Sequence, residues 1–246
     1  ARIHHPNVTM LLDAAVSSDG LRYLVMELLR GATLSEQLRN GIPLSLQRTL
    51  EIMIPICSAI SSAHRVGVLH RDIKPSNIFL HQDERCEVPK LLDFGIALPI
   101  EEEDAMEDSL PSTAPTLRTS RRSGDMVGTL CYMPPEQMDG LTCDGRADVY
   151  SLGVTLYEML TGRVPYAIQT DHTLRDLRRR MQETPIRPSE LQRQIPKALD
   201  DLILRLLSPI PSERPSAAEL LILLLDQAVS EMAPGALERL RSQCAA

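Results

Sequence analysis

The feature that most constrains this 246-residue chain is the run His-Arg-Asp-Ile-Lys-Pro-Ser-Asn from His70 to Asn77. Sixteen residues after Asn77, the chain continues with Asp93-Phe94-Gly95. A run of eight residues in a fixed order, followed at a fixed distance by three more, would rarely arise by chance. Any of these polar residues alone could be a solvated turn residue, but all of them in this order could not. We therefore interpret the two segments as parts of one functional site.

Length and composition predict a folded globule. With 246 residues, 43% of them apolar, the chain can bury a sizeable core. The net charge of −7 leaves no overall basic surface that would attract nucleic acid or anionic lipid. The most apolar stretch, Leu220–Leu225, is too short to span a bilayer, so we expect no membrane segment.

Five widely spaced cysteines contain no C-x-x-C pair, which favours free thiols in a reducing compartment over zinc or disulfides. We expect a cytoplasmic chain, with any membrane anchor of the parent protein outside this segment. The sequence begins Ala-Arg rather than with Met, which suits an internal fragment.

The first thirty residues predict a β-hairpin. Residues 10–16 and 23–28 are apolar runs on either side of an Asp-Gly pair, a strong hairpin signal. Two strands alone are only marginally stable in water, so this hairpin needs packing partners.

From Thr33 onward the apolar residues recur with the period of helices, and the predicted fold class is α+β with a mainly helical larger part. A short strand is expected over Lys90–Phe94, where it would present Asp93 from a rigid edge. Helices are expected from Thr33 and over residues 46–67, 148–161, 171–183, 196–207, 216–232 and 234–241.

Between Gly95 and Pro134 lie 38 residues with little apolar period, a length typical of functional or disordered loops. Residues 101–108 carry six acidic side chains and are interpreted as a solvated insertion. Residues 112–123 place serines and threonines among arginines, and they are either phosphate acceptors or inert loop residues.

These motifs resemble the eukaryotic-like serine/threonine protein kinases of bacteria. The resemblance also rests on Gly128-Thr129, on Tyr132-Met133-Pro134-Pro135-Glu136, in which proline replaces the usual alanine of A-P-E, and on Asp148-Val149-Tyr150-Ser151. It covers Ile3 to about Met232 and implies a protein-kinase-like fold. Residues 1–29 would be a remnant of the small lobe and the hinge, 30–232 the large lobe with catalytic loop 70–77 and activation segment 93–136, and 233–246 a tail helix.

The same resemblance indicates what this sequence lacks. The family places a Gly-rich phosphate loop and a V-A-I-K-type lysine upstream of the catalytic loop, and neither precedes His70 here. We therefore expect an N-terminally truncated kinase fragment that is inactive by itself, because groups that position the α- and β-phosphates are missing.

By resemblance, ATP and Mg²⁺ are the cofactors. Asp72 would be the catalytic base that takes the proton of a substrate hydroxyl. Lys74 would lie near the γ-phosphate of ATP, and a lysine there is typical of serine/threonine specificity. Asn77 and Asp93 would bind Mg²⁺, which prefers oxygen ligands.

The resemblance also assigns a nucleotide-binding hinge. Met26-Glu27-Leu28-Leu29 would form it, with backbone groups of Glu27 and Leu29 pairing with adenine. Phe79 would be the apolar floor under the adenine ring, or equally a plain core residue.

The remaining family positions are structural or regulatory. His70 and Phe94 are expected to be packing residues, Gly95 to give backbone freedom, and Thr129 to belong to the end of the activation segment. Asp148 would brace the catalytic-loop backbone, although a helix N-cap alone would also explain it. Glu136 and Arg214 would form a buried ion pair, and Arg71 could hold a phosphate on the activation loop.

The leading hypothesis is a protein serine/threonine kinase whose partners are ATP and protein substrates. A non-catalytic pseudokinase or protein-binding scaffold is the alternative, and retention of the four polar residues of the catalytic and metal positions weighs against it. A small-molecule phosphotransferase is less favoured still, because it would not need the peptide-docking segment that ends at Glu136.

Overall fold

A computed structural model describes residues 3–83, 86–94, 130–166, 178, 181–233, 235, 237, 238 and 240. Gly95, Thr129 and the acidic and serine-rich parts of the long loop lie outside these residues. So does most of the helix expected over 171–183, and the prediction is wrong for residues 181–183, which form a turn. The four described positions after residue 233 are helical, in agreement with the expected tail helix.

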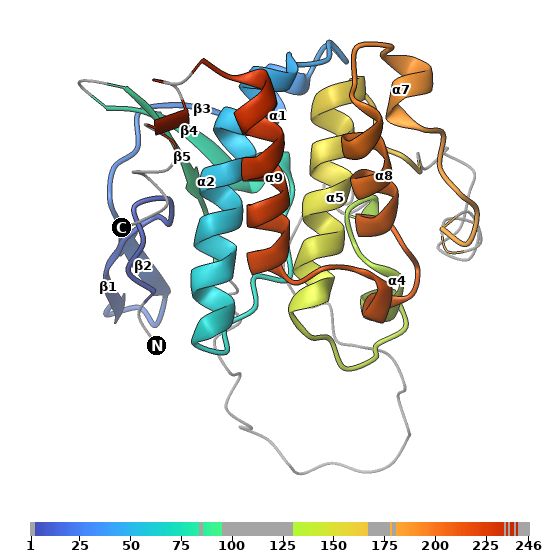
Figure 1. The fold of residues 1–246 in the computed structure, drawn as a ribbon. Coiled ribbons are helices and arrows are strands. Elements are labelled where there is room, and N and C mark those ends of the chain that lie inside the picture. The colour runs from blue at the N-terminus through green and yellow to red at the C-terminus, as the bar shows by residue number, and fades with distance from the viewer. Residues whose placement is uncertain are drawn as a thin grey trace, which may run out of the picture.

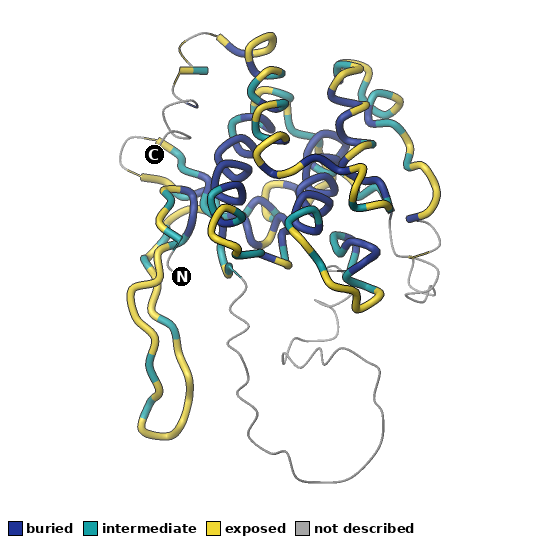
Figure 2. The backbone as a smooth tube through the Cα atoms, turned by 60° about the horizontal axis from the view of Figure 1, so that its bottom comes forward, coloured by how far each residue is buried: buried dark blue, intermediate teal, exposed yellow. Residues whose placement is uncertain are grey.

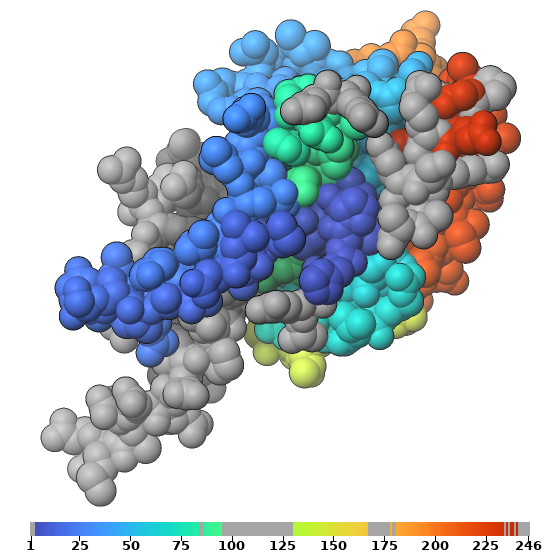
Figure 3. Space-filling view, turned by 90° about the vertical axis from the view of Figure 1, so that its left-hand side faces the viewer, coloured from blue at the N-terminus to red at the C-terminus, as the bar shows by residue number. Residues whose placement is uncertain are grey.

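The N-terminal hairpin is formed by strands β1 (Leu11–Val16) and β2 (Arg22–Met26), which pair antiparallel. The prediction is confirmed, with ends that differ by one or two residues. The hairpin projects from the rest of the molecule and is mostly exposed (Figures 2 and 3). Apolar side chains such as Leu12, 52% exposed, therefore remain uncovered by the described residues.

A second sheet lies beside the hairpin and contains β3 (Gly31–Thr33), β4 (Ile78–Gln82) and β5 (Glu87–Leu91) in the order β3-β4-β5. Both pairings are antiparallel. The strand expected over Lys90–Phe94 was placed too late, because β5 ends at Leu91. Asp93 has a φ of 51°, a left-handed backbone conformation that a strand cannot contain.

Helices form most of the remaining structure, and side chains at their first residues explain where several begin. Thr33 and Ser216 form capping boxes with Glu36 and Glu219, and Ser45 caps the long second helix. The helices are α1 (Leu34–Leu38), α2 (Leu46–Arg65), α4 (Pro135–Met138), α5 (Gly145–Thr161), α7 (Pro188–Leu191), α8 (Lys197–Leu206) and α9 (Ala217–Glu231), with 3₁₀ turns η1 (Pro75–Asn77) and η2 (Pro211–Glu213).

The core lies around α2 and α5, which run side by side through the helical part, with α9 packed on α2 and α8 on α5 (Figure 1). Helix α5 is buried on nearly all sides, as expected for a helix inside a larger globule. Asp144, rather than Asp148, is its N-cap, so the N-cap explanation of Asp148 is wrong. None of the described helices has the length and apolarity needed to cross a bilayer.

Candidate active site

The polar residues of the catalytic-loop motif form one hydrogen-bonded cluster. Lys74 Nζ lies 2.9 and 3.0 Å from the two carboxylate oxygens of Asp72. The Asn77 amide nitrogen donates to the backbone oxygen of Asp72 at 2.7 Å and to Asp72 Oδ2 at 3.0 Å. Lys74 and Asn77 are buried, whereas the Asp72 side chain is 26% exposed. The carboxylate is thus oriented from two sides and remains accessible to a substrate.

The backbone before Asp72 is held in an uncommon conformation. Arg71 has a φ of 66°, in the left-handed region that residues other than glycine seldom occupy. The buried Asp148 carboxylate accepts the amide hydrogens of His70 at 2.9 Å and of Arg71 at 2.7 Å. Gln137 of α4 donates to the Arg71 carbonyl at 3.1 Å. The backbone brace expected from Asp148 is therefore present.

Asp93 is brought next to this cluster by the backbone after β5. The Leu92 amide donates to the Asn77 carbonyl at 2.8 Å, which places Asp93 one residue from that contact. Its side chain is exposed and lines a cavity of about 600 Å³ whose other walls come from β1 and β2. Asp93 therefore faces open space.

Asn77 and Asp93 fit a Mg²⁺ bound together with a nucleotide. With the Asn77 nitrogen directed at Asp72, its amide oxygen is the atom left for a cation. Phosphates and waters supply most ligands of Mg²⁺ in such sites, so one or two protein oxygens suffice. The described residues contain no group of three or more His, Cys, Asp and Glu side chains that could hold a metal alone.

His70 and Phe94 lie in contact behind the cluster, as the sequence predicted for packing residues. Their rings meet edge to face at a centroid distance of 4.9 Å, and His70 Nε2 lies 2.8 Å from the Leu92 carbonyl. Burial lowers the pKa of His70, although the Leu92 carbonyl and Asp148 act in the opposite direction. A neutral, buried imidazole is suited to holding the backbone.

The expected hinge follows β2, and Glu27 ties it to the neighbouring segments. Glu27 Oε1 accepts the Met10 amide hydrogen at 2.8 Å and lies 2.6 Å from Lys90 Nζ. Burial raises the pKa of Glu27, but the hydrogen bonds from Lys90 and Met10 outweigh burial, and the net shift is downward. Met26 is 40% exposed and Leu29 is half-buried, so both border the surface.

Phe79 lies on β4 opposite Lys90 of β5. It is half-buried and belongs neither to the main apolar cluster nor to the side chains packed against that cluster. This position favours the adenine floor over a plain core residue, and the role remains a prediction.

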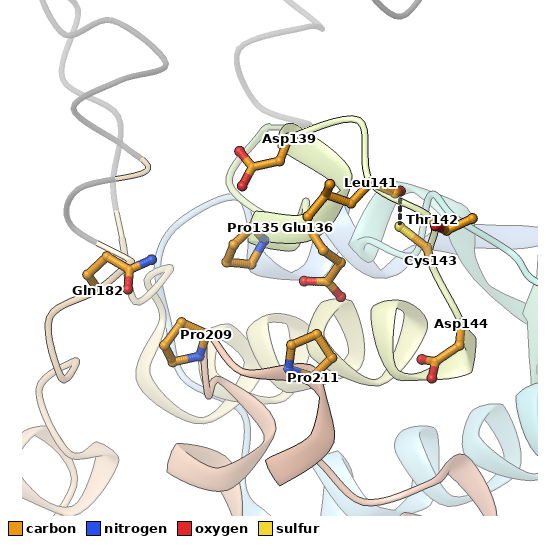
Figure 4. A pocket seen from close by; sticks show the side chains of 10 residues that line it. All are labelled: Pro135, Glu136, Asp139, Leu141, Thr142, Cys143, Asp144, Gln182, Pro209 and Pro211. Atoms are coloured by element: carbon orange, nitrogen blue, oxygen red, sulfur yellow. Dashed lines mark hydrogen bonds between the residues drawn. The ribbon is translucent and has the colours of Figure 1, made fainter.

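Glu136 of α4 and Arg214 form the buried ion pair expected from the family resemblance. Arg214 Nη1 and Nη2 lie 2.6 and 3.0 Å from the two carboxylate oxygens of Glu136. Two parallel hydrogen bonds of this kind fix both position and direction. A cavity of about 440 Å³ borders Glu136, with Pro209 and Pro211 on its opposite wall (Figure 4).

Three polar contacts near the site escaped the sequence reasoning. His64 bonds to Asp148, Lys90 to Glu27, and the Tyr132 hydroxyl to Glu158 at 2.5 Å. Burial and the neighbouring Glu158 raise the pKa of Tyr132, and burial also raises the pKa of Glu158. Each pair joins segments that are distant in sequence, so local patterns could not reveal it. The one available signal was the position of Glu158, an acidic residue one turn before the end of α5.

Comparison with known proteins agrees with this geometry. The protein kinase domain family matches residues 1–223. Serine/threonine-protein kinase pkn3 of Myxococcus xanthus is 36% identical over 222 residues, which cover 89% of this chain and 38% of that protein. Serine/threonine-protein kinase PknB of Mycobacterium leprae is 35% identical over 224 residues, covering 89% and 33%. The chain thus spans roughly a third of the length of these relatives.

Solved structures show the same fold. The crystal structure of the Mycobacterium tuberculosis PknI kinase domain superposes with a TM-score of 0.65 at 24% identity. The match covers 93% of this chain and 75% of that one. The family match over nearly the whole described molecule therefore shows that this chain belongs to the protein kinase domain family.

Proposed function

We propose that this chain is the catalytic large lobe, hinge and part of the small lobe of a protein serine/threonine kinase. The reaction is transfer of the ATP γ-phosphate to serine or threonine hydroxyls of proteins. The observation that carries the proposal is the Asp72–Lys74–Asn77 cluster, held against the core by Asp148. Bacterial relatives at about 35% identity carry the name serine/threonine-protein kinase, which supports the same activity.

Each residue of the cluster has a separate task. Asp72 accepts the hydrogen bond of the substrate hydroxyl and takes its proton as the oxygen attacks phosphorus. Lys74, whose Nζ contacts the Asp72 carboxylate, supplies a positive charge for the transferred phosphoryl group. Asn77 and Asp93 hold Mg²⁺, which neutralises charge on the phosphate oxygens when it is bound.

The other parts of the site follow from the same assignment. The Glu27 and Leu29 backbone binds adenine over Phe79, and the segment ending at Glu136 receives the substrate peptide. The net negative charge supports protein rather than nucleic-acid partners, and we place the reaction in the cytoplasm, where ATP is abundant.

The test compares the complete gene product with two variants in a Mg²⁺-ATP assay on serine- and threonine-containing proteins. Asp72→Asn is expected to lower kcat by about 10²- to 10⁴-fold, the contribution typical of a general base. Asp226→Asn, which changes an exposed carboxylate on α9, should leave kcat unchanged. Chelation of Mg²⁺ should abolish transfer.

The proposal fails if the complete product binds ATP and Mg²⁺ but modifies no protein, which would support the scaffold alternative. Transfer to a sugar or an aminoglycoside instead would support the small-molecule phosphotransferase. The 246 residues alone are expected to show no transfer, because they include neither the Gly-rich loop nor the upstream lysine.

A further inference from the structure

His64, in the last turn of α2, contacts the residue that holds the catalytic loop. Its Nε2 lies 2.8 Å from Asp148 Oδ2. The His64 side chain is 17% exposed and that of Asp148 is 1% exposed. A contact between two largely buried polar groups from different helices is a fixed part of the structure rather than a surface encounter.

This contact completes the hydrogen bonding of one carboxylate. Asp148 Oδ2 accepts hydrogen bonds from His64 Nε2 and from the His70 amide, and Oδ1 accepts one from the Arg71 amide. An ionised carboxylate carries no hydrogen, so the proton of this bond must be on His64 Nε2. Removing one donor from a buried carboxylate leaves part of its charge uncompensated.

The residue that needs this support is Arg71, directly before Asp72. Its left-handed backbone is unfavourable for a residue other than glycine and persists only where the surroundings enforce it. Asp148 enforces it by accepting two successive amides. If the carboxylate rotates, Arg71 can relax toward φ < 0, and the direction of Asp72 changes.

We propose that His64 is a positioning residue for phosphoryl transfer. It keeps the Asp148 carboxylate in the orientation that holds the Arg71 backbone and thereby aims Asp72 at the substrate hydroxyl. The expected effect on phosphoryl transfer rests on the proposed function. The hydrogen bonds that connect His64 through Asp148 to the loop backbone do not depend on it.

Gly145, the first residue of α5, gives a second and independent way to disturb His64. A Cβ at position 145 would lie 2.6 Å from His64 Nδ1 and 2.8 Å from its Cε1. The nearest atoms belong to a rigid ring rather than to the far end of a flexible side chain, so we expect Gly145→Ala to displace His64 from Asp148. The same Cβ meets no such obstacle once the ring is removed.

The experiment uses the complete gene product and the variants His64→Ala, His64→Gln, Gly145→Ala and the double variant His64→Ala with Gly145→Ala. His64→Ala is expected to lower kcat about tenfold, as for loss of one hydrogen bond to a charged group, with KM for ATP unchanged. His64→Gln, whose amide can donate to Asp148, should recover most of kcat.

The alanine at position 145 separates positioning from general damage. Gly145→Ala alone should lower kcat in the wild-type background, and it should have no further effect in the His64→Ala background. Additive losses in the double variant would overturn the proposal, as would an unchanged kcat in His64→Ala.

A readout that needs no catalysis is amide hydrogen exchange in the nucleotide-free protein. The amides of His70 and Arg71 should exchange faster in His64→Ala and in Gly145→Ala, while amides in the middle of α5, such as Leu152, keep their wild-type rates. Unchanged exchange at residues 70 and 71 would refute the positioning role. If neither the wild type nor any variant transfers phosphate, the proposed function fails. Hydrogen exchange at residues 70 and 71 still tests whether His64 holds the loop through Asp148.

Discussion

Arg214 is the largest side chain that the described part of the molecule buries completely. Its guanidinium is nonetheless fully used, because it donates two hydrogen bonds to Glu136 and one each to the carbonyls of Ser208, Arg146 and Pro209. The Tyr150 ring lies 4.9 Å from its central carbon and adds a cation–π contact. Helix α4 is thus attached to the core through the single charge of Arg214.

Removing that charge should be more harmful than removing the whole pair. Arg214→Met is expected to lower the free energy of unfolding by about 3–5 kcal/mol, because it leaves the Glu136 carboxylate buried without a partner. The double variant Arg214→Met with Glu136→Met should be more stable than Arg214→Met alone. Urea unfolding of the three proteins measures both effects, and simple additivity would contradict the explanation.

The lowered pKa of His70 predicts that the stability of the folded protein depends on pH. Burial lowers its pKa in the folded state, whereas in the unfolded chain it titrates near the model-peptide value of 6.5. As pH falls through 6.5, the unfolded chain gains a proton that the folded protein cannot yet accept, so the folded state loses stability. His70→Gln should therefore reduce the loss of urea stability between pH 7.5 and 5.5.

His5, whose pKa burial also lowers, acts in the same direction and provides the matched comparison. His5→Gln alone should reduce the pH dependence, and both replacements together should reduce it further. If stability fell equally in wild type and in all three variants, other groups would be responsible.

At the scale of helices and strands, element ends follow local side-chain chemistry. Helix α5 ends at Gly162, whose φ of 74° suits glycine. A Cβ on this residue would also lie 2.0 Å from the Gly41 carbonyl oxygen. The helix end is therefore constrained twice, by conformation and by a neighbouring backbone.

Gly67, just beyond α2, is the control for this double constraint. Its φ is 75°, but a Cβ there would meet nothing within 4 Å. Gly67→Ala should cost about 1 kcal/mol for the left-handed conformation alone, and Gly162→Ala should cost clearly more. Thermal unfolding of both variants measures the difference, and equal losses would show that the Gly41 backbone gives way.

The sequence predicted elements with strong local signals and missed those without them. The hairpin and the capped helices beginning near Thr33, Ser45 and Ser216 were predicted within about two residues. Strands β3 and β4 were missed, since β3 has three residues and β4 directly follows the catalytic loop. Their pairing is set by tertiary contacts rather than by periodicity.

On the scale of the whole molecule, stability should be uneven. Helices α2 and α5 are buried over most of their length, whereas the β1–β2 hairpin is exposed on nearly all sides (Figure 2). Amides paired within the hairpin should therefore exchange at least about tenfold faster than amides in α2, because opening the hairpin does not require global unfolding. Exchange followed by mass spectrometry measures this, and equal protection would show that the hairpin folds as part of the core.

The candidate site could be predicted where its residues lie close together in the sequence. Asp72, Lys74 and Asn77 lie within six residues, and their motif alone indicated a common site. His64, Lys90 and Glu158 were not predictable, because each acts through a partner that only the fold brings near. Family resemblance predicted the distant pairs Glu136–Arg214 and Asp148 with the loop, which periodicity and composition could not.

Two contacts at the candidate site each join residues 78 positions apart: His70 with Asp148, and Glu136 with Arg214. During synthesis, the loop around Asp72 leaves the ribosome long before the carboxylate that shapes it. At about 5–20 residues per second, the delay for 78 residues is roughly 4–16 s. Nascent chains that stall before α5 therefore carry the loop from His70 to Asn77 without the Asp148 carboxylate that holds its backbone.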